Sequence, residues 1–311
     1  MPSHIALEFL LKILKYPSSL FTLLAARGIL FKKCDERHDD GAFPDHDKIV
    51  TALFLVKNFN TMGGNLSMNR YREDHTFIDL LKRSLDERFF EWADKELAHF
   101  AERTIIYDER ARHTDREGQP RLIKYDRYGE DISEIWVNEG YRQTADEVYR
   151  TGIAAYPHKP IPQLEEKGNY IYAFAQGYLL SQVEPGLYCP VTLTMAVAYL
   201  LDHFADDSLK KKYLPHVIST GEVPLYEGAT FLTERQGGSD VGANETKAVT
   251  RGDHYLLYGE KYFASNAGRA GVAAVLARIE GAGSGTKGLS LFLVPWRRED
   301  GSLNGITIRR L

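Results

Sequence analysis

Residues 230–241, TFLTERQGGSDV, contain the residue types best suited to bind a ligand. Their Gly237-Gly238-Ser239 turn places two residues without side-chain bulk beside a hydroxyl. Successive backbone N–H groups in such a turn can form a concavity that binds an anion, and Ser239 adds a hydrogen-bond donor. An ordinary surface turn has the same composition, so this turn alone indicates phosphate binding only weakly. Neither a dinucleotide-binding G-x-G-x-x-G nor a Walker loop surrounds it.

A second segment, residues 258–268, reads YGEKYFASNAG. Phe263 offers a flat aromatic face, and the hydroxyl of Ser265 follows two positions later. Side chains two positions apart in an extended strand point to the same face, so an extended conformation would let ring and hydroxyl contact one ligand. Core packing is the simpler interpretation of Phe263 taken alone. Only its pairing with the first segment favours a binding site.

Together, L-T-E…G-G-S-D-V and G-E-K-Y-F-A-S-N resemble the two middle-domain signatures of acyl-CoA dehydrogenases, and the separation between them matches. Three further stretches fit this family. DSLKKKYLPHVISTGE resembles its helix and turn before the β-domain, GLSLFLVP resembles a following strand, and GITIRRL resembles the strand after that. The resemblance covers roughly residues 165–311 and implies that the protein binds FAD.

The resemblance implies six cofactor-binding residues: Leu232, Thr233, Gly238, Ser239, Phe263 and Ser265. The backbone of Leu232 and the hydroxyl of Thr233 would lie near the flavin N5/O4 edge, where hydrogen bonds stabilise the negative charge that arrives with hydride. Ser239 would face the pyrophosphate of FAD or the phosphates of an acyl-CoA substrate. Phe263 would cover the ring face and Ser265 the ring edge. Phe263 replaces the family's usual Trp, which keeps a stacking surface and loses the indole N–H.

The resemblance also implies a reaction, the oxidation of an acyl-CoA thioester at Cα–Cβ with hydride transfer to FAD. Proton abstraction needs a carboxylate on the face of the substrate opposite the flavin. In the family this Glu lies in a C-terminal helical domain, and no residue of 1–311 matches its motif, so we expect it downstream of Leu311. Glu234 is better interpreted as a structural anchor at a strand end. His203 and His216 are interpreted as surface or core positions on helices. The chain alone is therefore expected to lack activity and to bind flavin weakly.

A subgroup is indicated further upstream. Residues 121–153, RLIKYDRYGEDISEIWVNEGYRQTADEVYRTGI, resemble the corresponding segment of AidB-type acyl-CoA dehydrogenases, and the Gln236-Gly237-Gly238 form of the turn also suits them. The run Asn138-Glu139-Gly140-Tyr141 departs from the His-containing stretch that AidB-type sequences often have. Two alternatives stay open: an AidB-type flavoprotein of the DNA-alkylation and stress response, or a non-catalytic acyl or fatty-acid binding protein.

Composition limits the class of protein. The 311 residues are 43% apolar and 26% charged, which is ordinary for a globular protein and long enough for two domains. A net charge of −4 without a basic stripe makes nucleic-acid binding by this segment unlikely. Cys34 and Cys189 are the only cysteines, so neither a disulfide framework nor a zinc cluster is indicated, and no metal site is predicted. These features favour a cytoplasmic protein, and the family resemblance implies a homo-oligomer with an electron acceptor that the sequence does not identify.

The secondary structure that must position the two segments is predicted to be helical in the first part of the chain and stranded in the last part. Residues 1–226 are expected to form an N-terminal helical domain, with 1–45 as a helical extension. The apolar stretch 5–31 is interrupted by charges and by Pro17, so buried helices are favoured over a membrane span. Apolar residues at three- and four-residue spacings predict one helix over 76–105. The polar stretch 106–135 predicts a loop or short hairpin, 137–154 a helix, and 168–205 two helices separated at Pro185.

After residue 228 the sequence predicts strands. Short runs rich in Val, Leu, Tyr and Phe are bounded by Gly, Asn and Asp, with breaks typical of hairpins at 251–253 and 280–288. The expected fold class is α+β: an all-helical domain followed by an antiparallel, barrel-like β-domain, as in acyl-CoA dehydrogenases. Residues 227–311 would be an incomplete middle domain, and the C-terminal helical domain of the family would be absent.

Overall fold

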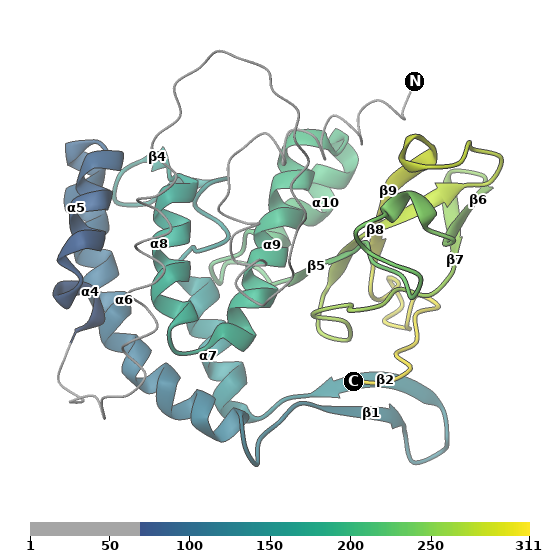
Figure 1. The fold of residues 1–311 in the computed structure, drawn as a ribbon, viewed down its shortest axis with the longest axis horizontal. Coiled ribbons are helices and arrows are strands. Elements are labelled where there is room, and N and C mark those ends of the chain that lie inside the picture. The colour runs from purple at the N-terminus through teal and green to yellow at the C-terminus, as the bar shows by residue number, and fades with distance from the viewer. Residues whose placement is uncertain (1–68) are drawn as a thin grey trace. The chain divides into compact units, whose positions relative to one another are not determined.

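The computed structural model describes residues 69–311, which form one compact unit. The expected helical extension over 1–45 and the apolar stretch 5–31 lie outside the described residues. Helices dominate the first part of this unit (Figure 1). They are α4 (Arg70–Glu73), α5 (His75–Ser84), α6 (Glu87–Thr114), α7 (Glu139–Arg150), α8 (Tyr170–Ser181), α9 (Pro185–Phe204) and α10 (Asp207–Val217).

The stretch expected as one helix over 76–105 is two helices, because polar caps divide it. Leu85 is extended and ends α5, and the carboxylate of Asp86 accepts the backbone N–H of Phe89 at the start of α6. Asn138 caps α7 in the same way by accepting the N–H of Tyr141. Its amide nitrogen also donates to the hydroxyl of Thr114, the last residue of α6, and to the carbonyl of Gly118 in the turn that follows. The departure from the AidB pattern at this position therefore has a structural role.

Helices α8 and α9 separate at Pro185, as the sequence predicts, and approach closely at Gly177. A methyl group at Gly177 would lie 2.1 Å from the hydroxyl oxygen of Tyr188 on α9. Because Tyr188 is buried, it cannot move into solvent to make room. The small residue is therefore required for the contact between these two helices.

We expect Gly177→Ala to lower the free energy of unfolding by about 1–3 kcal/mol, the usual cost of overpacking a core. Urea denaturation measures this loss. Gly283→Ala is the matched control, since a methyl group there meets no atom within 4 Å. Equal stability of both variants and the parent chain would contradict the close approach.

The strands fall into three sheets. β1 (Arg121–Tyr125) pairs with β2 (Asp131–Trp136), and β3 (Pro160–Ile161) pairs with β4 (Glu166–Lys167). The third sheet has the order β5-β8-β6-β7, with β9 also paired to β8. Its strands are β5 (Gly228–Phe231), β6 (Lys247–Arg251), β7 (His254–Tyr258), β8 (Val272–Ile279) and β9 (Leu289–Pro295). The segment expected to be all-helical thus contains two hairpins. The one at 121–136 lies in the polar stretch that predicted a loop or short hairpin, and the β3–β4 hairpin was not predicted.

Both predicted hairpins of the third sheet are confirmed, since β6 pairs antiparallel with β7 and β8 with β9. The antiparallel part of the expectation holds for these two hairpins, and the barrel is not confirmed for the described residues. β5 and β6 both pair parallel with β8, along its first and last parts. After β5 the chain makes a long connection that includes the β6–β7 hairpin before β8 begins, and such connections permit parallel pairing. With β9 along the other side of β8, the described sheet stays open at β7 and β9.

The last residues, GITIRRL, were expected to form a strand and do not. Side chains of the β1–β2 hairpin hold this segment instead. Ser133 Oγ accepts the N–H of Ile308 at 2.8 Å, and Lys124 Nζ donates to the carbonyl of Ile308 at 2.8 Å. Because these bonds come from side chains, no backbone ladder forms. Figure 1 shows the hairpin extending to the C-terminal end of the chain.

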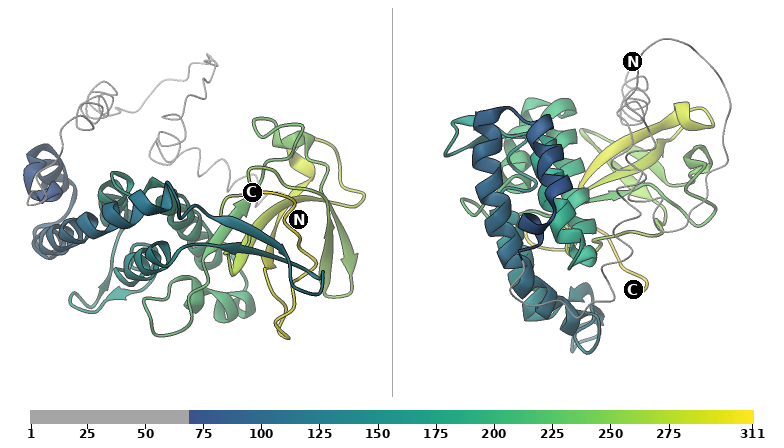
Figure 2. Two further views of the ribbon diagram at one scale, coloured as in Figure 1. Left: turned by 90° about the horizontal axis from the view of Figure 1, so that it is seen from below. Right: turned by 60° about the vertical axis from the view of Figure 1, so that its left-hand side comes forward.

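Helix α9 joins the helices to the third sheet by packing against β5, and two views show the helices on one side of β5 and the other strands beyond it (Figures 1 and 2). Thr194 on α9 accepts the N–H of Gly228 at 2.9 Å and lies 2.9 Å from the hydroxyl of Tyr149 on α7. In the part of the chain that the structure describes, α9 is the one helix long and apolar enough to cross a membrane by length and composition. Half of its apolar window is buried, as expected for a helix at the centre of a fold.

Candidate functional site

The two segments singled out in the sequence lie against each other. The backbone N–H of Tyr262 donates to the carbonyl of Thr233 at 2.9 Å. The carbonyl of Leu232 accepts from Asn244 Nδ2 at 2.9 Å and from Lys261 Nζ at 3.3 Å. The fold therefore brings the residues around 233 and 262 together by hydrogen bonds that involve the main chain of both segments.

Glu234 lies at the centre of this contact, and it is a structural residue. Its carboxylate is buried and accepts from Lys261 Nζ at 2.6 Å, from Thr246 Oγ1 at 2.6 Å, and from the N–H of Glu245 at 2.7 Å. Burial alone would raise the pKa of Glu234, but these hydrogen bonds outweigh it and lower the pKa to about 2. A carboxylate held in this way is a poor proton acceptor, so Glu234 anchors the turn, as the sequence interpretation proposed.

The pKa of Glu234 predicts acid sensitivity. A carboxyl group whose pKa is about 2 in the folded chain and about 4.3 when unfolded stabilises the fold above pH 4.3, and this contribution disappears as the pH falls toward 2. We expect a loss of about 3 kcal/mol from this group between pH 5 and pH 2. Urea denaturation over this range, compared with Glu234→Gln, isolates its contribution. Parallel pH profiles for the two proteins would contradict the assignment.

The groups expected to contact a cofactor lie at the surface beside this anchor. Leu232, Ser239 and Ser265 are exposed, and the side chain of Phe263 is 81% exposed. Within residues 69–311, the hydroxyls of Thr233, Ser239 and Ser265 make no hydrogen bond. The groups expected to contact a cofactor are therefore accessible and not engaged by other side chains of the described residues.

Gly238 keeps the turn close to Thr233. A methyl group at Gly238 would lie 2.7 Å from Thr233 Oγ1. That separation is too short for a carbon atom, so any side chain here would displace the Thr233 hydroxyl or move the turn away. The requirement for Gly at this position explains why two glycines precede Ser239.

The expectation that Phe263 lies in an extended strand is wrong. β7 ends at Tyr258, and Phe263 has a φ of +53°, in the left-handed region that non-glycine residues rarely adopt. The N–H of Ser265 donates to the carbonyl of Phe263, so the chain turns here. Strand alternation therefore does not align ring and hydroxyl. A strained, exposed aromatic residue is nevertheless typical of ligand-binding sites.

Sequence reasoning missed the residues that hold the site together. Lys261 belongs to the second signature, but the sequence indicates no role for it. In the structure its side chain is only 9% exposed and pairs with Glu234. Asn244 bonds Leu232, and its Oδ1 is buried without a partner in the described chain. Asn266 Nδ2 donates to the carbonyl of Gly228 at 3.0 Å and so fixes the second segment to β5. The spacing of G-x-K and S-N in the signature was the signal that pointed to Lys261 and Asn266.

Comparison with known families agrees with this geometry. Residues 60–221 match the family described as the adaptive response protein AidB N-terminal domain. Residues 229–311 match the acyl-CoA dehydrogenase middle domain, which includes both segments of the site. The chain belongs to the AidB-like acyl-CoA dehydrogenase family.

Relatives of this AidB-like chain are longer proteins. It is 30% identical over 253 residues to acyl-CoA dehydrogenase family member 11 of Caenorhabditis elegans, covering 78% of this chain and 40% of that protein. It is 29% identical over 202 residues to the putative acyl-CoA dehydrogenase AidB of Escherichia coli strain K12, covering 62% of this chain and 35% of that protein.

Two solved structures have the same fold over 78% of the chain. One is the apo form of Bd2924, with a TM-score of 0.71 and 30% identity, of which 49% is covered. The other is ACDH-11 of Caenorhabditis elegans in complex with C11-CoA, with a TM-score of 0.68 and 28% identity, of which 42% is covered. The chain therefore spans less than half the length of these relatives.

Proposed function

We propose that this chain supplies the flavin-contacting part of an FAD-dependent acyl-CoA dehydrogenase-like protein. The observation that carries the proposal is the contact between the two segments, which gathers free hydroxyls and the exposed ring of Phe263 on one surface. A flavin has a flat apolar ring that an aromatic side chain can cover and polar edges that hydroxyls can bond. When bound, the flavin would accept hydride from the substrate.

The residues present fit this cofactor. The Leu232 backbone and the Thr233 hydroxyl would bond the polar edge of the ring, and Ser239, beside Gly238, would bond phosphate oxygens. Phe263 would stack on the ring, and Ser265 would approach its edge. Asn244 Oδ1 is a further polar atom without a partner, buried behind Leu232.

An acyl-CoA thioester is the proposed substrate class, and oxidation at Cα–Cβ the proposed reaction. The ACDH-11 structure is a complex with C11-CoA, which supports an acyl-CoA ligand for this chain as well. Glu234 is the carboxylate of the described site that lies beside the proposed flavin position. It is held by Lys261 and other donors, so it is not available to abstract a proton. We therefore propose that the proton-abstracting base comes from elsewhere in the complete protein, and that residues 1–311 alone bind FAD without turnover. A homo-oligomer and a cytoplasmic location remain part of the proposal.

Phe263→Ala tests the flavin site. We expect the variant to bind FAD about tenfold more weakly, because a stacked ring contributes roughly 1 kcal/mol or more. Phe263→Trp keeps an aromatic stacking surface and should bind FAD at least as tightly as the parent chain. Flavin fluorescence quenching on titration of the purified chain measures the affinities.

Tyr128→Ala is the matched control, since this ring is 75% exposed and lies on the β1–β2 hairpin outside both segments. It should leave FAD affinity unchanged. Absence of FAD binding at saturating concentrations, or equal affinity in Phe263→Ala, would overturn the proposed site. Acyl-CoA-dependent flavin reduction by residues 1–311 would instead refute the assignment of the base to another part of the protein.

The match of residues 60–221 to the AidB N-terminal domain favours one second candidate, a flavoprotein of the AidB-type alkylation and stress response. A salt-dependent DNA gel shift of the complete protein tests it, because binding through phosphate contacts weakens steeply as salt rises. The net charge of −4 predicts no shift by this chain alone.

A further inference from the structure

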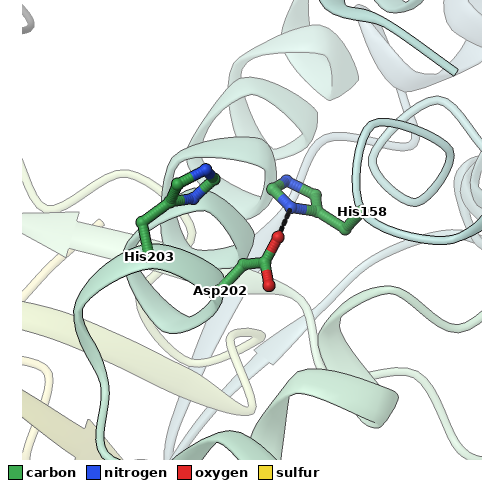
Figure 3. A group of neighbouring side chains, drawn as sticks. All are labelled: His158, Asp202 and His203. Carbon is green, nitrogen blue, oxygen red and sulfur yellow. Dashed lines mark hydrogen bonds and ion pairs between the residues drawn. The ribbon is translucent and has the colours of Figure 1, made fainter. Parts of the chain in front are cut away.

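Three side chains with metal-binding atoms meet at the C-terminal end of α9, away from the two flavin segments in sequence. They are His158, from the turn after α7, and Asp202 and His203, from α9. His158 Nδ1 lies 2.9 Å from Asp202 Oδ2, and one ligand atom from each of the three residues lies within 4.8 Å of the others. Figure 3 shows the three side chains together, with the hydrogen bond between His158 and the Asp202 carboxylate as a dashed line.

His203 has one ring nitrogen bonded and the other available for a ligand, whereas both ring nitrogens of His158 have a partner. His203 Nδ1 lies 3.0 Å from the carbonyl of Tyr199 and can only donate to it, so Nε2 carries a free lone pair. His158 Nε2 lies 3.1 Å from the hydroxyl of Tyr170, so a proton on Nε2 would leave Nδ1 as the ligand atom facing Asp202. Metal-binding histidines almost always have such an oxygen partner on the second nitrogen, because it fixes the tautomer and the ring orientation.

The separations suit a small ion. Ligand atoms that bind zinc at about 2.1 Å in tetrahedral geometry are about 3.3 Å apart. His158 Nδ1 and Asp202 Oδ2 are 2.9 Å apart because they share a hydrogen bond, which a metal ion would replace. The remaining closure, from separations of up to 4.8 Å, would need a small shift of His203, whose exposed ring bonds the Tyr199 carbonyl and stacks on the Tyr199 ring. His158 and Asp202 are 1% and 20% exposed, so the site would be partly shielded from water.

We propose that His158, Asp202 and His203 form a binding site for a divalent transition-metal ion, and that Zn²⁺ fits it best. Two imidazoles, one carboxylate and a water molecule make a four-coordinate set that zinc accepts. The ion would link the turn after α7 to the end of α9.

A neighbouring cation gives the proposal a specific signature. Lys167 Nζ lies 3.9 Å from Asp202 Oδ2, and its side chain is 56% exposed. An ammonium at this distance competes with a metal ion for the carboxylate. Removing Lys167 should therefore tighten metal binding, whereas it would have no such effect if the three residues were only a hydrogen-bonded contact.

The test is a Zn²⁺ titration of the chelator-stripped full chain against a competing zinc-binding dye. We expect His203→Ala to weaken zinc binding at this site about 100-fold, since even the loss of a supporting partner costs 10- to 100-fold. Asp202→Asn should behave similarly, and Lys167→Ala should bind more tightly than the parent chain. Zn²⁺ should also raise the melting temperature of the parent chain but not that of His203→Ala.

His216→Ala is a closely matched control. His216 also bonds a backbone carbonyl through Nδ1, at 2.8 Å from Pro224, and stacks on a tyrosine, Tyr226, but it has no part in the cluster. It should bind zinc as the parent chain does. Equal zinc affinity in His203→Ala, His216→Ala and the parent chain would overturn the proposal. His203 is exposed, so His203→Ala should fold. It therefore tests the proposal even if Asp202→Asn fails to fold.

Discussion

Lys261→Ala is expected to lower the free energy of unfolding by about 3–5 kcal/mol, as measured by urea denaturation at pH 7. The substitution leaves the carboxylate of Glu234 charged while its side chain is only 3% exposed. An uncompensated buried charge is far more costly than the loss of an ion pair in water. The backbone N–H of Glu245 and the hydroxyl of Thr246 still donate to it, which places the expected loss toward the lower end of the range.

A surface ion pair provides the control for this prediction. Lys212 Nζ lies 2.8 Å from the carboxylate of Glu299, at the same kind of distance, but both side chains are more than half exposed. Lys212→Ala should therefore cost less than about 1 kcal/mol. A loss of similar size in both variants would show that burial of the Glu234–Lys261 pair does not matter. The same Lys261→Ala protein should also bind FAD more weakly, because Lys261 bonds the carbonyl of Leu232.

The features of the candidate site that depend on neighbouring residues alone could be predicted from the sequence. Gly237, Gly238 and Ser239 do form a surface turn, and Thr233, a few residues before it, bonds the segment that contains Phe263. The interpretation of Glu234 as an anchor agrees with its contacts to Lys261 and Thr246. The sequence indicated this role because Glu234 directly follows a predicted buried strand. The roles of all six cofactor-binding residues stay predictions until a flavin titration is done.

Backbone conformation at the site was not predictable in the same way. The sequence around Phe263 reads as a strand because Tyr and Phe favour strands. Phe263 instead has a positive φ, and its neighbour Tyr262 bonds Thr233, 29 positions away. Gln236 is a local donor to Glu234, but its other donors, Glu245, Thr246 and Lys261, are 11 to 27 positions away. A single sequence without aligned relatives does not reveal such pairings.

The same limit applies to the fold. Helix ends follow local signals, as Asp86 and Asn138 show, and hairpins follow Gly and Asp at their turns. The parallel pairing of β5 with β8 has no local signal, since it depends on how a long connection returns. The meeting of His158 with Asp202 across 44 positions is a comparable case, and neither helix pattern nor spacing indicated it.

Arg269→Ala is expected to destabilise the chain by about 3–5 kcal/mol for a related reason, at the junction between the helices and the sheet. Arg269 donates to the carboxylate of Glu227 at 3.0 Å, and the side chain of Glu227 is only 7% exposed. The other donors to Glu227 are weak, with Tyr149 Oη at 3.5 Å and Asn266 Nδ2 at 3.4 Å. Without Arg269 the charge would have no adequate partner.

The pH dependence of the Arg269→Ala variant distinguishes a buried charge from lost packing. Burial already raises the pKa of Glu227, and removal of the guanidinium should raise it further. The folded variant would then bind a proton that the unfolded chain releases, so its deficit relative to the parent should shrink as the pH falls from 8 to 5. Arg309→Ala, which breaks an exposed pair with Glu260, should cost less than about 1 kcal/mol at every pH. A deficit in Arg269→Ala that does not change with pH would mean that packing of Arg269 over the ring of Tyr141, rather than its charge, holds the junction.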